Sequence, residues 1–398
     1  MEQEVSSIQI CPCYVDLTRE TGGVANIVRQ ICLHLARRGQ HVLLLCGNRE
    51  MGRAQAEPGI RHIDRFLSME VFDQHLHPLL GPTTAVTKRI LSLHGKSIAH
   101  VHTCFSAFTE AAMAACHRKH IPFIFTPHGK FSEHSVARYH WAKDLWWRLK
   151  AGKAIRDART IAVSSADEVL AMELYGLSQP WRVIPNGYEA PPAEPCKERG
   201  IIPQPYVLFL GYLDPRKQPE FLVEAFSRSE ARCSHRLVFA GPDTYGHQTA
   251  VQRRAQELGM DHVVFFGPAY GEKKWSLLYH AACLCLPSLG EGLPLVLCEA
   301  LGAAVPSIFS RACNFREIAA RGAGVMLDEF DSSQWARAID RVCLDRECNR
   351  LMRAAARSLQ PEYTWSEIVK RWMDLYEHVA SASSPHSVDR DKDRAAYG

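Results

Sequence analysis

The sequence lacks the features that place a chain in a membrane, in a secretory route or on nucleic acid. No apolar stretch approaches the roughly 20 residues that span a bilayer, and residues 1–10 are acidic and polar, unlike a secretion signal. Lys and Arg total 47 against 43 Asp and Glu over 398 residues, and this net charge of +4 is too small to indicate a nucleic-acid-coating protein. We therefore expect a cytoplasmic protein with no nucleic-acid partner.

The chain has 14 cysteines but no CxxC pair. Its two CxC pairs, Cys11 with Cys13 and Cys283 with Cys285, have no second pair at the spacing of a zinc site. Cys46 and three of these four residues lie in apolar, strand-like runs, where a free thiol packs as a small hydrophobic side chain. Reduced cysteines are the prediction, and a structural metal site is the alternative.

Short apolar runs alternate with helix-length amphipathic segments along the whole chain, which predicts an α/β protein built from parallel βαβ units. Each half has enough strands for its own doubly wound sheet. The predicted strands are 8–10, 41–46, 98–102, 122–126 and 160–164 in the first half, and 206–211, 236–241, 263–267, 283–287 and 305–309 in the second. The predicted helices are 24–38, 105–119, 136–158, 219–229, 248–259, 271–281, 293–303, 333–343 and 365–380.

A segment rich in proline, glycine and charge, residues 184–205, separates the two halves and is typical of an interdomain linker. The helix at 365–380 has Trp365, Ile368, Trp372, Leu375 and Tyr376 on one face, which must dock against another element. The predicted organisation is a first domain at 1–190, a linker at 191–203, a second domain at 204–362, a terminal helix at 363–380 and a disordered tail at 381–398.

Two candidate sites follow strands of the first half, where α/β sheets bind ligands. Thr21-Gly22-Gly23-Val24 precedes a helix, so the backbone can approach a ligand and the helix N-terminus suits a phosphate. Glycine pairs more often only make turns, and GxGxxG is absent, so this is no dinucleotide fingerprint. His128 follows the strand at 122–126 beside a glycine, placed for hydrogen bonding or acid–base chemistry, whereas a structural role is the alternative for any one of 19 histidines.

Two more candidate sites follow strands of the second half. Arg216 and Lys217 are adjacent after the strand at 206–211, which indicates either a diphosphate clamp or a solvated charge pair in a turn. Gly290-Glu291-Gly292 forms a tight loop after the strand at 283–287, and Pro294 suits the first turn of the helix that follows. Glu299 lies among apolar residues of that helix and therefore needs a partner.

The Glu-x7-Glu spacing of Glu291 and Glu299, with TGGV, TPHG, IPNG and a DPRK segment after a LFLG strand, resembles the retaining glycosyltransferases of the GT-B fold, family four (group 1 type). The resemblance extends from about residue 8 to about residue 380. It implies two Rossmann-like, doubly wound domains facing a cleft, with the nucleotide-diphosphate sugar bound mainly by the second domain and the acceptor mainly by the first. It also implies a terminal helix that returns to the first domain, and neither a metal nor a cofactor beyond the donor substrate.

The resemblance implies a role for each candidate residue. Glu291 would hold the donor sugar's hydroxyls, Glu299 the ribose, and His128 the donor sugar near the reacting carbon. Lys217 and Arg216 would neutralise the leaving diphosphate, which calls for positive charge placed in advance. Backbone N–H groups would assist them at Gly22, Gly23, Gly292, Leu293 and Leu295, while Pro294, which has no N–H, belongs to the same donor-binding loop.

The chain departs from the family at one position, because Gly211-Tyr212 stands where the family usually has Gly-Arg, and Arg216 is the candidate replacement. The leading hypothesis is a retaining transferase that moves a hexose to a glycan or lipid-linked glycan in surface polysaccharide assembly. The departure motivates an alternative, a catalytically weak sugar-nucleotide-binding or partner protein of the same fold. An epimerase of this architecture is a third hypothesis, which Glu-x7-Glu with TPHG disfavours.

Positive charge gathers at residues 138–156, which contain six Lys or Arg and one Asp. Trp141, Leu145 and Leu149 share one helical face, and Trp147 lies among basic residues. A basic helix with tryptophan predicts peripheral contact with the anionic inner face of a membrane. The alternative is that the tryptophans belong to the core and the basic residues to a solvated face.

Overall fold

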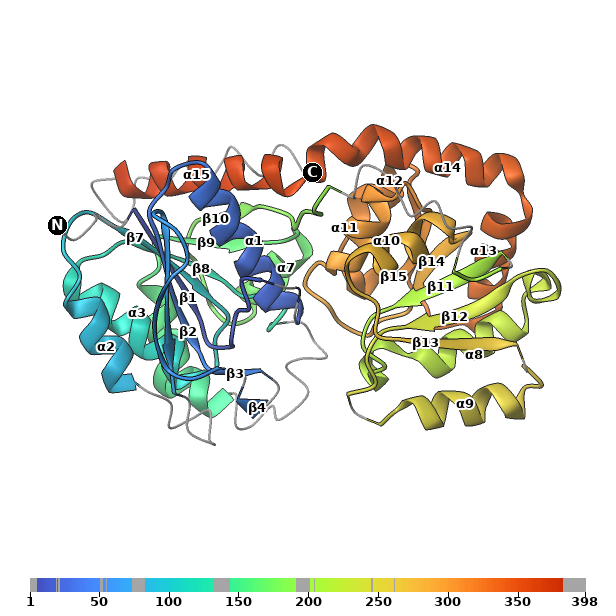
Figure 1. The fold of residues 1–398 in the computed structure, drawn as a ribbon, viewed down its shortest axis with the longest axis horizontal. Helices are drawn as coiled ribbons and strands as arrows, with labels where there is room; N and C mark the ends of the chain where they lie inside the picture. Colours follow the sequence, from blue (N-terminus) through green and yellow to red (C-terminus); the bar gives the residue numbers. More distant parts are fainter. Residues whose placement is uncertain are drawn as a thin grey trace. The chain divides into compact units, whose positions relative to one another are not determined.

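The computed structural model describes residues 6–18, 20, 22–50, 53–54, 56–73, 83–131, 144–190, 201–203, 205–244, 246–260 and 262–381. The chain divides into two compact units, Met1–Pro185 together with Trp365–Gly398, and Asn186–Thr364. In each unit helices pack on a mostly parallel sheet (Figure 1). The last helix therefore groups with the first unit, from which it is separated in sequence by the whole second unit.

The first unit contains an eight-stranded sheet in the order β10-β9-β8-β7-β1-β2-β6-β5. All pairs are parallel except β5 with β6. The strands are β1 (Ser7–Cys11), β2 (Val42–Gly47), β5 (Gly59–His62), β6 (Leu67–Phe72), β7 (Ile98–His102), β8 (Phe123–Thr126), β9 (Thr160–Val163) and β10 (Trp181–Val183), with a separate pair β3 (Arg49–Glu50) and β4 (Arg53–Ala54). The helices are α1 (Gly23–Arg37), α2 (Thr83–Leu91), α3 (Ala107–Lys119), a π-helix η2 (Trp147–Ala151), α6 (Gly152–Arg156), α7 (Asp167–Glu173) and α15 (Trp365–Ser381).

The second unit contains a six-stranded parallel sheet in the order β13-β12-β11-β14-β15-β16. Its strands are β11 (Tyr206–Leu210), β12 (Arg236–Ala240), β13 (Val263–Gly267), β14 (Cys283–Leu286), β15 (Ser307–Ser310) and β16 (Gly324–Leu327). Its α-helices are α8 (Pro219–Ser227), α9 (Gln248–Glu257), α10 (Gly271–His280), α11 (Leu295–Gly302), α12 (Arg316–Ala320), α13 (Ser332–Leu344) and α14 (Arg346–Leu359). Short 3-10 turns lie at Pro215–Lys217, Glu230–Cys233, Arg311–Cys313 and Gln360–Tyr363.

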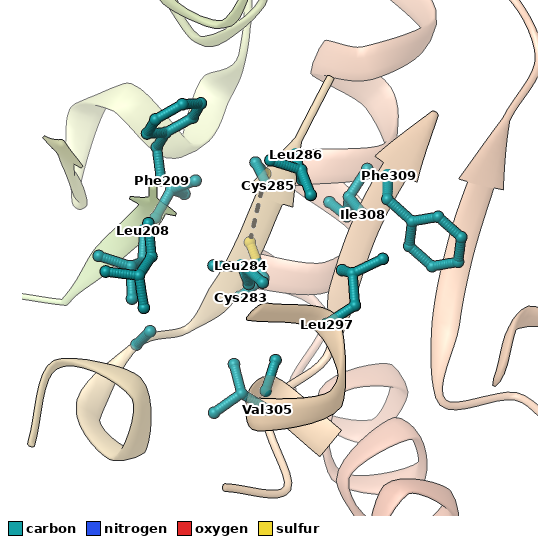
Figure 2. Close-up of a cluster of buried hydrophobic side chains, with 14 of the residues drawn as sticks. Leu208, Phe209, Cys283, Leu284, Cys285, Leu286, Leu297, Val305, Ile308 and Phe309 are labelled. Carbon is teal, nitrogen blue, oxygen red and sulfur yellow. Dashed lines mark hydrogen bonds between the residues drawn. The ribbon is translucent and has the colours of Figure 1, made fainter. Parts of the chain in front are cut away.

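The central strands are apolar without alternation because helices cover both faces of each sheet. Every residue of β1, β11 and β14 is buried. Figure 2 shows this core in the second unit, where the side chains of β14 lie between those of β11 and β15, including Leu208 and Ile308. Burying a side chain of this size contributes about 1.5–3 kcal/mol, so the central strands anchor the loops that leave them.

The described cysteines carry free thiols, as expected. Cys283 and Cys285 are fully buried and act as small core side chains (Figure 2). Cys11 and Cys46 are buried in the first unit, and burial raises the pKa of the Cys46 thiol to about 12.

Helix α15 buries the predicted apolar face, since Trp365, Ile368, Trp372, Leu375 and Tyr376 are all buried. It contacts α1 and β7 of the first unit. The Arg38 guanidinium fixes its first turn by donating to the Ser366 carbonyl at 2.7 Å. No helix in the described part of the chain has the length and hydropathy needed to cross a bilayer.

All ten predicted strands are present, but strands β3, β4, β5, β6, β10 and β16 and helices α2, α7, α12 and α14 were not predicted. The predicted helix at 136–158 is only partly described, because residues 132–143 lie outside the described residues. Its described part is helical from 144 to 156, with a π-helical stretch at Trp147–Ala151. The linker at 191–200 and the tail from 382 lie outside the described residues as well.

Each sheet has a position where the chain order reverses, between β1 and β7 in the first unit and between β11 and β14 in the second. Ligands of doubly wound sheets bind at the carboxyl ends of the strands at such positions. The loops that follow β1, β7 and β8, and those that follow β11 and β14, are therefore the first places to look for a site.

Candidate active site

The loop after β11 carries Lys217 and Arg216 in a short 3-10 turn. The Asp214 carboxylate starts this turn by accepting the Arg216 N–H at 2.8 Å. The strand exit is tight, since a Cβ on Gly241 would lie 2.0 Å from the Gly211 carbonyl oxygen. Both glycines also have positive φ, at 150° for Gly211 and 140° for Gly241, so close backbone packing fixes the direction in which this loop leaves the sheet.

Glu291 lies in the loop after β14 and receives both cations of the β11 loop. Its carboxylate accepts from Lys217 Nζ at 2.7 Å and from the Ser288 hydroxyl at 2.9 Å, and Arg216 lies 3.1 Å away. Burial alone would raise the pKa of Glu291, but Lys217 and Arg216 outweigh it and lower the pKa to about 2. Glu291 is thus a fixed anion between two cations at the switch point of the second sheet.

Hydrogen bonds hold the Glu291 loop in one shape. Asn314 Nδ2 donates to the carbonyls of both Glu291 and Gly292, at 2.9 and 3.0 Å. Arg216 donates to the Gly290 carbonyl. Asn186, the asparagine of IPNG, is buried and donates to the Leu293 carbonyl at 2.7 Å. The loop is therefore positioned before any ligand arrives.

Helix α11 follows this loop directly, with Pro294 as its N-cap residue and Leu295 as its first residue. It has neither a side-chain cap nor an acidic residue in its first turn. The amide groups of a first turn have no partner within their own helix, and the helix dipole favours an anion there. Gly292, Leu293, Pro294 and Leu295 thus lead into a helix N-terminus suited to phosphate.

Glu299 lies just over one turn into α11 and has the partner that its apolar setting requires. Lys274 of α10 donates to Glu299 Oε1 at 2.7 Å. The two side chains are only 6% and 12% exposed. A buried pair of this kind needs good geometry to offset the loss of hydration, so α10 and α11 are held in register by opposite charges.

Gly22 and Gly23 begin α1 after β1, at the switch point of the first sheet. Gly22 is the N-cap residue of α1, which has no side-chain cap and no acidic residue in its first turn. A Cβ on Gly23 would meet nothing within 4 Å. The start of α1 therefore has open space beside its backbone, while Thr21 lies outside the described residues.

His128 lies after β8 in a left-handed turn, with φ of 52° at His128 and 74° at Gly129. Glu168 is buried beneath the turn, where it accepts from the Gly129 N–H and from the backbone and hydroxyl of Ser164. Nε2 of His128 lies 3.0 Å from Nδ1 of His102. Burial and the charge of Lys130 lower the pKa of His128 to about 3, so its ring is neutral near pH 7.

The structure brings Arg216, Lys217 and Glu291 together beside the start of α11. This arrangement can hold a diphosphate and a polar sugar in place, because it combines two cations, a helix N-terminus and a fixed carboxylate. Gly22, Gly23 and His128 belong to the first unit and Glu299 to the second.

Two family models match the chain. The model described as glycosyl transferases group 1 covers residues 197–359, and the model of glycosyltransferase family 4 covers residues 21–190. The chain belongs to the family-four glycosyltransferases. The resemblance found in the motifs is confirmed, and the enzyme class is that of a glycosyltransferase.

Some relatives of this glycosyltransferase align with more than nine-tenths of its length at low identity. It is 25% identical to the D-inositol 3-phosphate glycosyltransferase of Nocardia farcinica over 94% of this chain and 88% of that protein. Sucrose-phosphate synthase from Thermosynechococcus elongatus is similar in structure, with a TM-score of 0.74, 18% identity, and coverage of 95% and 100% of the two chains. Anabaena HepE, solved with UDP-glucose, has a TM-score of 0.70, 16% identity, and coverage of 94% and 99%. At these identities the solved structures show a shared GT-B fold alone.

Several residues of the glycosyltransferase site were not assigned from the sequence. The sequence shows Asn186 in the IPNG motif but assigns it no role. It also shows that Glu299 needs a partner, but it does not identify Lys274 as that partner. The signal that could have revealed the residues around His128 was polar side chains inside buried strands. These residues are Gln9, His100 and His102.

Proposed function

We propose that this glycosyltransferase is a retaining, metal-independent hexosyltransferase that uses a nucleotide-diphosphate sugar. The observation that carries the proposal is Glu291 held by Lys217 and Arg216 at the switch point of the second sheet. A leaving diphosphate needs positive charge placed in advance. Lys217, Arg216 and the start of α11 supply that charge from the protein itself.

Arg216 replaces the arginine that the family usually has at position 212. Its guanidinium lies 3.1 Å from Glu291 and also donates to the Gly290 carbonyl, so it sits within the same loop cluster as Lys217. Two cations there favour an active transferase over the alternative, a protein that binds a sugar nucleotide without turning it over.

The acceptor that we propose is a glycan or a lipid-linked glycan in surface polysaccharide assembly. The donor part of the proposal is supported by HepE, whose solved structure contains UDP-glucose. Same-face attack on the sugar, with the departing diphosphate helping to deprotonate the acceptor, would preserve the anomeric configuration. In this reaction the acceptor oxygen forms the new glycosidic bond, the bond to the diphosphate oxygen breaks, and the acceptor proton passes to the diphosphate.

A screen of nucleotide sugars tests this function. The true donor should raise the melting temperature, because a ligand at 100 times its Kd adds about 2.7 kcal/mol to the free energy of unfolding. With that donor and a lipid-linked glycan, product NMR should show the anomeric configuration of the donor. Saturable binding without transfer or donor hydrolysis would support the binding-protein alternative instead.

We also propose that the segment 144–156 contacts an anionic membrane surface and so brings the enzyme to a lipid-linked acceptor. Leu145 and Leu149 are 53% and 67% exposed, beside Arg148 and Lys150. Trp147 does not join them, because it is buried against Phe131 and Tyr175. For this tryptophan the alternative, a place in the core, is the one observed. Trp141 lies outside the described residues.

Changing Leu145 and Leu149 together to glutamine should weaken binding to phosphatidylglycerol vesicles by about tenfold or more, since each exposed leucine contributes apolar area to a membrane contact. Co-sedimentation measures it, with phosphatidylcholine vesicles for comparison. The matched control is the double change of Leu344 and Leu351, exposed leucines of the second unit, to glutamine. Equal binding to neutral and anionic vesicles would reject the contact.

A further inference from the structure

A run of hydrogen bonds leads from His128 into the core of the first unit. His128 Nε2 lies 3.0 Å from His102 Nδ1, and His102 Nε2 lies 3.0 Å from Gln9 Oε1. Gln9 Nε2 then donates to the Tyr376 hydroxyl of α15 at 3.1 Å. Gln9 and His102 are fully buried and Tyr376 is nearly so, which makes these bonds costly to lose.

The run continues from Tyr376 back toward the loop in which it began. The Tyr376 hydroxyl lies 2.8 Å from His100 Nδ1, and His100 Nε2 lies 2.8 Å from Thr126 Oγ1. Thr126 ends β8, two residues before His128. We name these six residues the histidine relay: His128, His102, Gln9, Tyr376, His100 and Thr126.

The Gln9 oxygen sets the direction of the histidine relay. An amide oxygen only accepts, so the proton of His102 must be on Nε2. A neutral imidazole has a single N–H, and Nδ1 of His102 therefore accepts a bond from Nε2–H of His128. By the same rule Nδ1 of His128 carries a lone pair and no proton.

The buried surroundings of the histidine relay favour neutral imidazole rings at its three histidines. Burial lowers the pKa of His100 and of His102 well below its ordinary value, and that of His128 to about 3. The ring centroids of His100 and His102 lie 3.9 Å apart, so two positive charges there would repel each other strongly. The remaining bonds follow the same direction, since Tyr376 accepts from Gln9 and can donate to His100, whose Nε2–H can donate to Thr126.

We propose that His102, oriented by Gln9 and Tyr376, is a positioning residue that holds His128 in the tautomer with an unprotonated Nδ1. No described residue forms a hydrogen bond with that nitrogen. His128 then meets its substrate as a hydrogen-bond acceptor, so its partner is a sugar hydroxyl and not a phosphate or carbonyl oxygen. The identity of that substrate rests on the proposed function, whereas the tautomer does not.

The histidine relay also gives α15 a role in the site besides packing. Tyr376 is the only relay residue that comes from α15, and its hydroxyl bonds to both Gln9 and His100. The neighbouring Trp372 ring packs 4.5 Å from that of His100. The last helix thus holds, through Gln9 and His102, the histidine of the TPHG loop.

The test is nitrogen NMR on the full chain labelled with ¹⁵N-histidine, in which the His128 signals are those lost in His128→Gln. Wild type should show a protonated Nε2 and a bare Nδ1, unchanged from pH 6 to pH 8. His102→Leu removes the bond from His128 and should give a mixture of tautomers. With the true donor and acceptor, kcat should fall on the order of tenfold to a hundredfold, the range seen when a residue that orients a metal-binding histidine is lost, with the donor KM within about twofold.

Two further variants keep the test decisive. His102→Asn places an amide oxygen where Nδ1 was and should restore the single tautomer and most of kcat. Tyr376→Phe serves if His102→Leu does not fold, because losing the Tyr376 hydroxyl frees Gln9 and should also produce the second tautomer. The control is Tyr206→Phe, which removes a buried hydroxyl outside the relay and should leave the single tautomer unchanged. A proton on Nδ1 in wild type, or one unchanged tautomer in both relay variants, would overturn the proposal. Because the NMR needs no substrate, failure of transfer would count against the proposed function alone.

Discussion

Replacing Lys217 by alanine is expected to lower kcat on the order of 10²–10³-fold with a folded protein. Its ammonium is nearly buried at the switch point of the second sheet, 2.7 Å from Glu291. A buried cation aimed at a leaving diphosphate stabilises charge that develops only in the transition state, and losing one such group typically costs about 2.7–4 kcal/mol. Steady-state kinetics with the identified donor measure the effect.

The matched control for Lys217→Ala is Arg254→Ala. Arg254 also pairs with a carboxylate of the second unit, Glu224 at 3.0 Å, but the pair joins α9 to α8 and lies outside the loops after β11 and β14. Its removal should leave kcat within about twofold, since the pair is partly exposed to solvent, where ion pairs contribute little, and lies away from the candidate site. Equal losses in the two variants would indicate general destabilisation, and full activity in Lys217→Ala and Glu291→Gln would remove both residues from the mechanism.

The same variant should change the response to pH. In wild type Lys217 and Arg216 hold the pKa of Glu291 at about 2, so the stability from the ionised carboxylate is present above its unfolded pKa and is lost as the pH falls toward 2. Without Lys217, one cation fewer opposes the effect of burial on the carboxylate, so the pKa of Glu291 rises. The acid limb of kcat/KM should therefore move to higher pH in Lys217→Ala and stay in place in Arg254→Ala.

Most central strands followed from the sequence, whereas three of the four edge strands of the two sheets, β5, β10 and β16, were missed. Runs such as YVLFLG contain only apolar residues because helices cover both sides of the sheet. Strand β5, Gly59–His62, lies at the sheet edge and is largely exposed, so its residues show no apolar run. Helix α14 was missed although it is strongly amphipathic, because only three of its 14 residues are large and apolar while four are arginine.

The candidate site residues that lie in loops directly after strands could be predicted from the sequence. Those that depend on contacts between distant parts of the chain could not. Glycines and charged residues directly after strands identified the Glu291 loop and Lys217. Nothing in the sequence pairs Gln9 with Tyr376, which are 367 positions apart, or Lys274 with Glu299. Such pairs are set by how helices pack on the sheet, and a single sequence carries no direct record of that packing.

Replacing Lys274 by methionine is expected to lower the free energy of unfolding by about 3–5 kcal/mol, the typical result of removing one partner from a buried ion pair. Glu299 would then keep its charge beside α10 without the ammonium 2.7 Å away. Urea unfolding measures the change. Lys273→Met is the matched control, because Lys273 precedes it on the same helix and is exposed, and it should change stability by less than about 0.5 kcal/mol.

The double variant Lys274→Met with Glu299→Leu separates folding from function. Replacing both members of a buried pair with apolar side chains is often neutral or stabilising, so much of the lost stability should return. If Glu299 holds the ribose of the donor, nucleotide affinity should stay low in that stable protein, by about tenfold or more for lost hydrogen bonds to a charged group. Recovery of donor binding together with stability would instead show that Glu299 serves only to join α10 and α11.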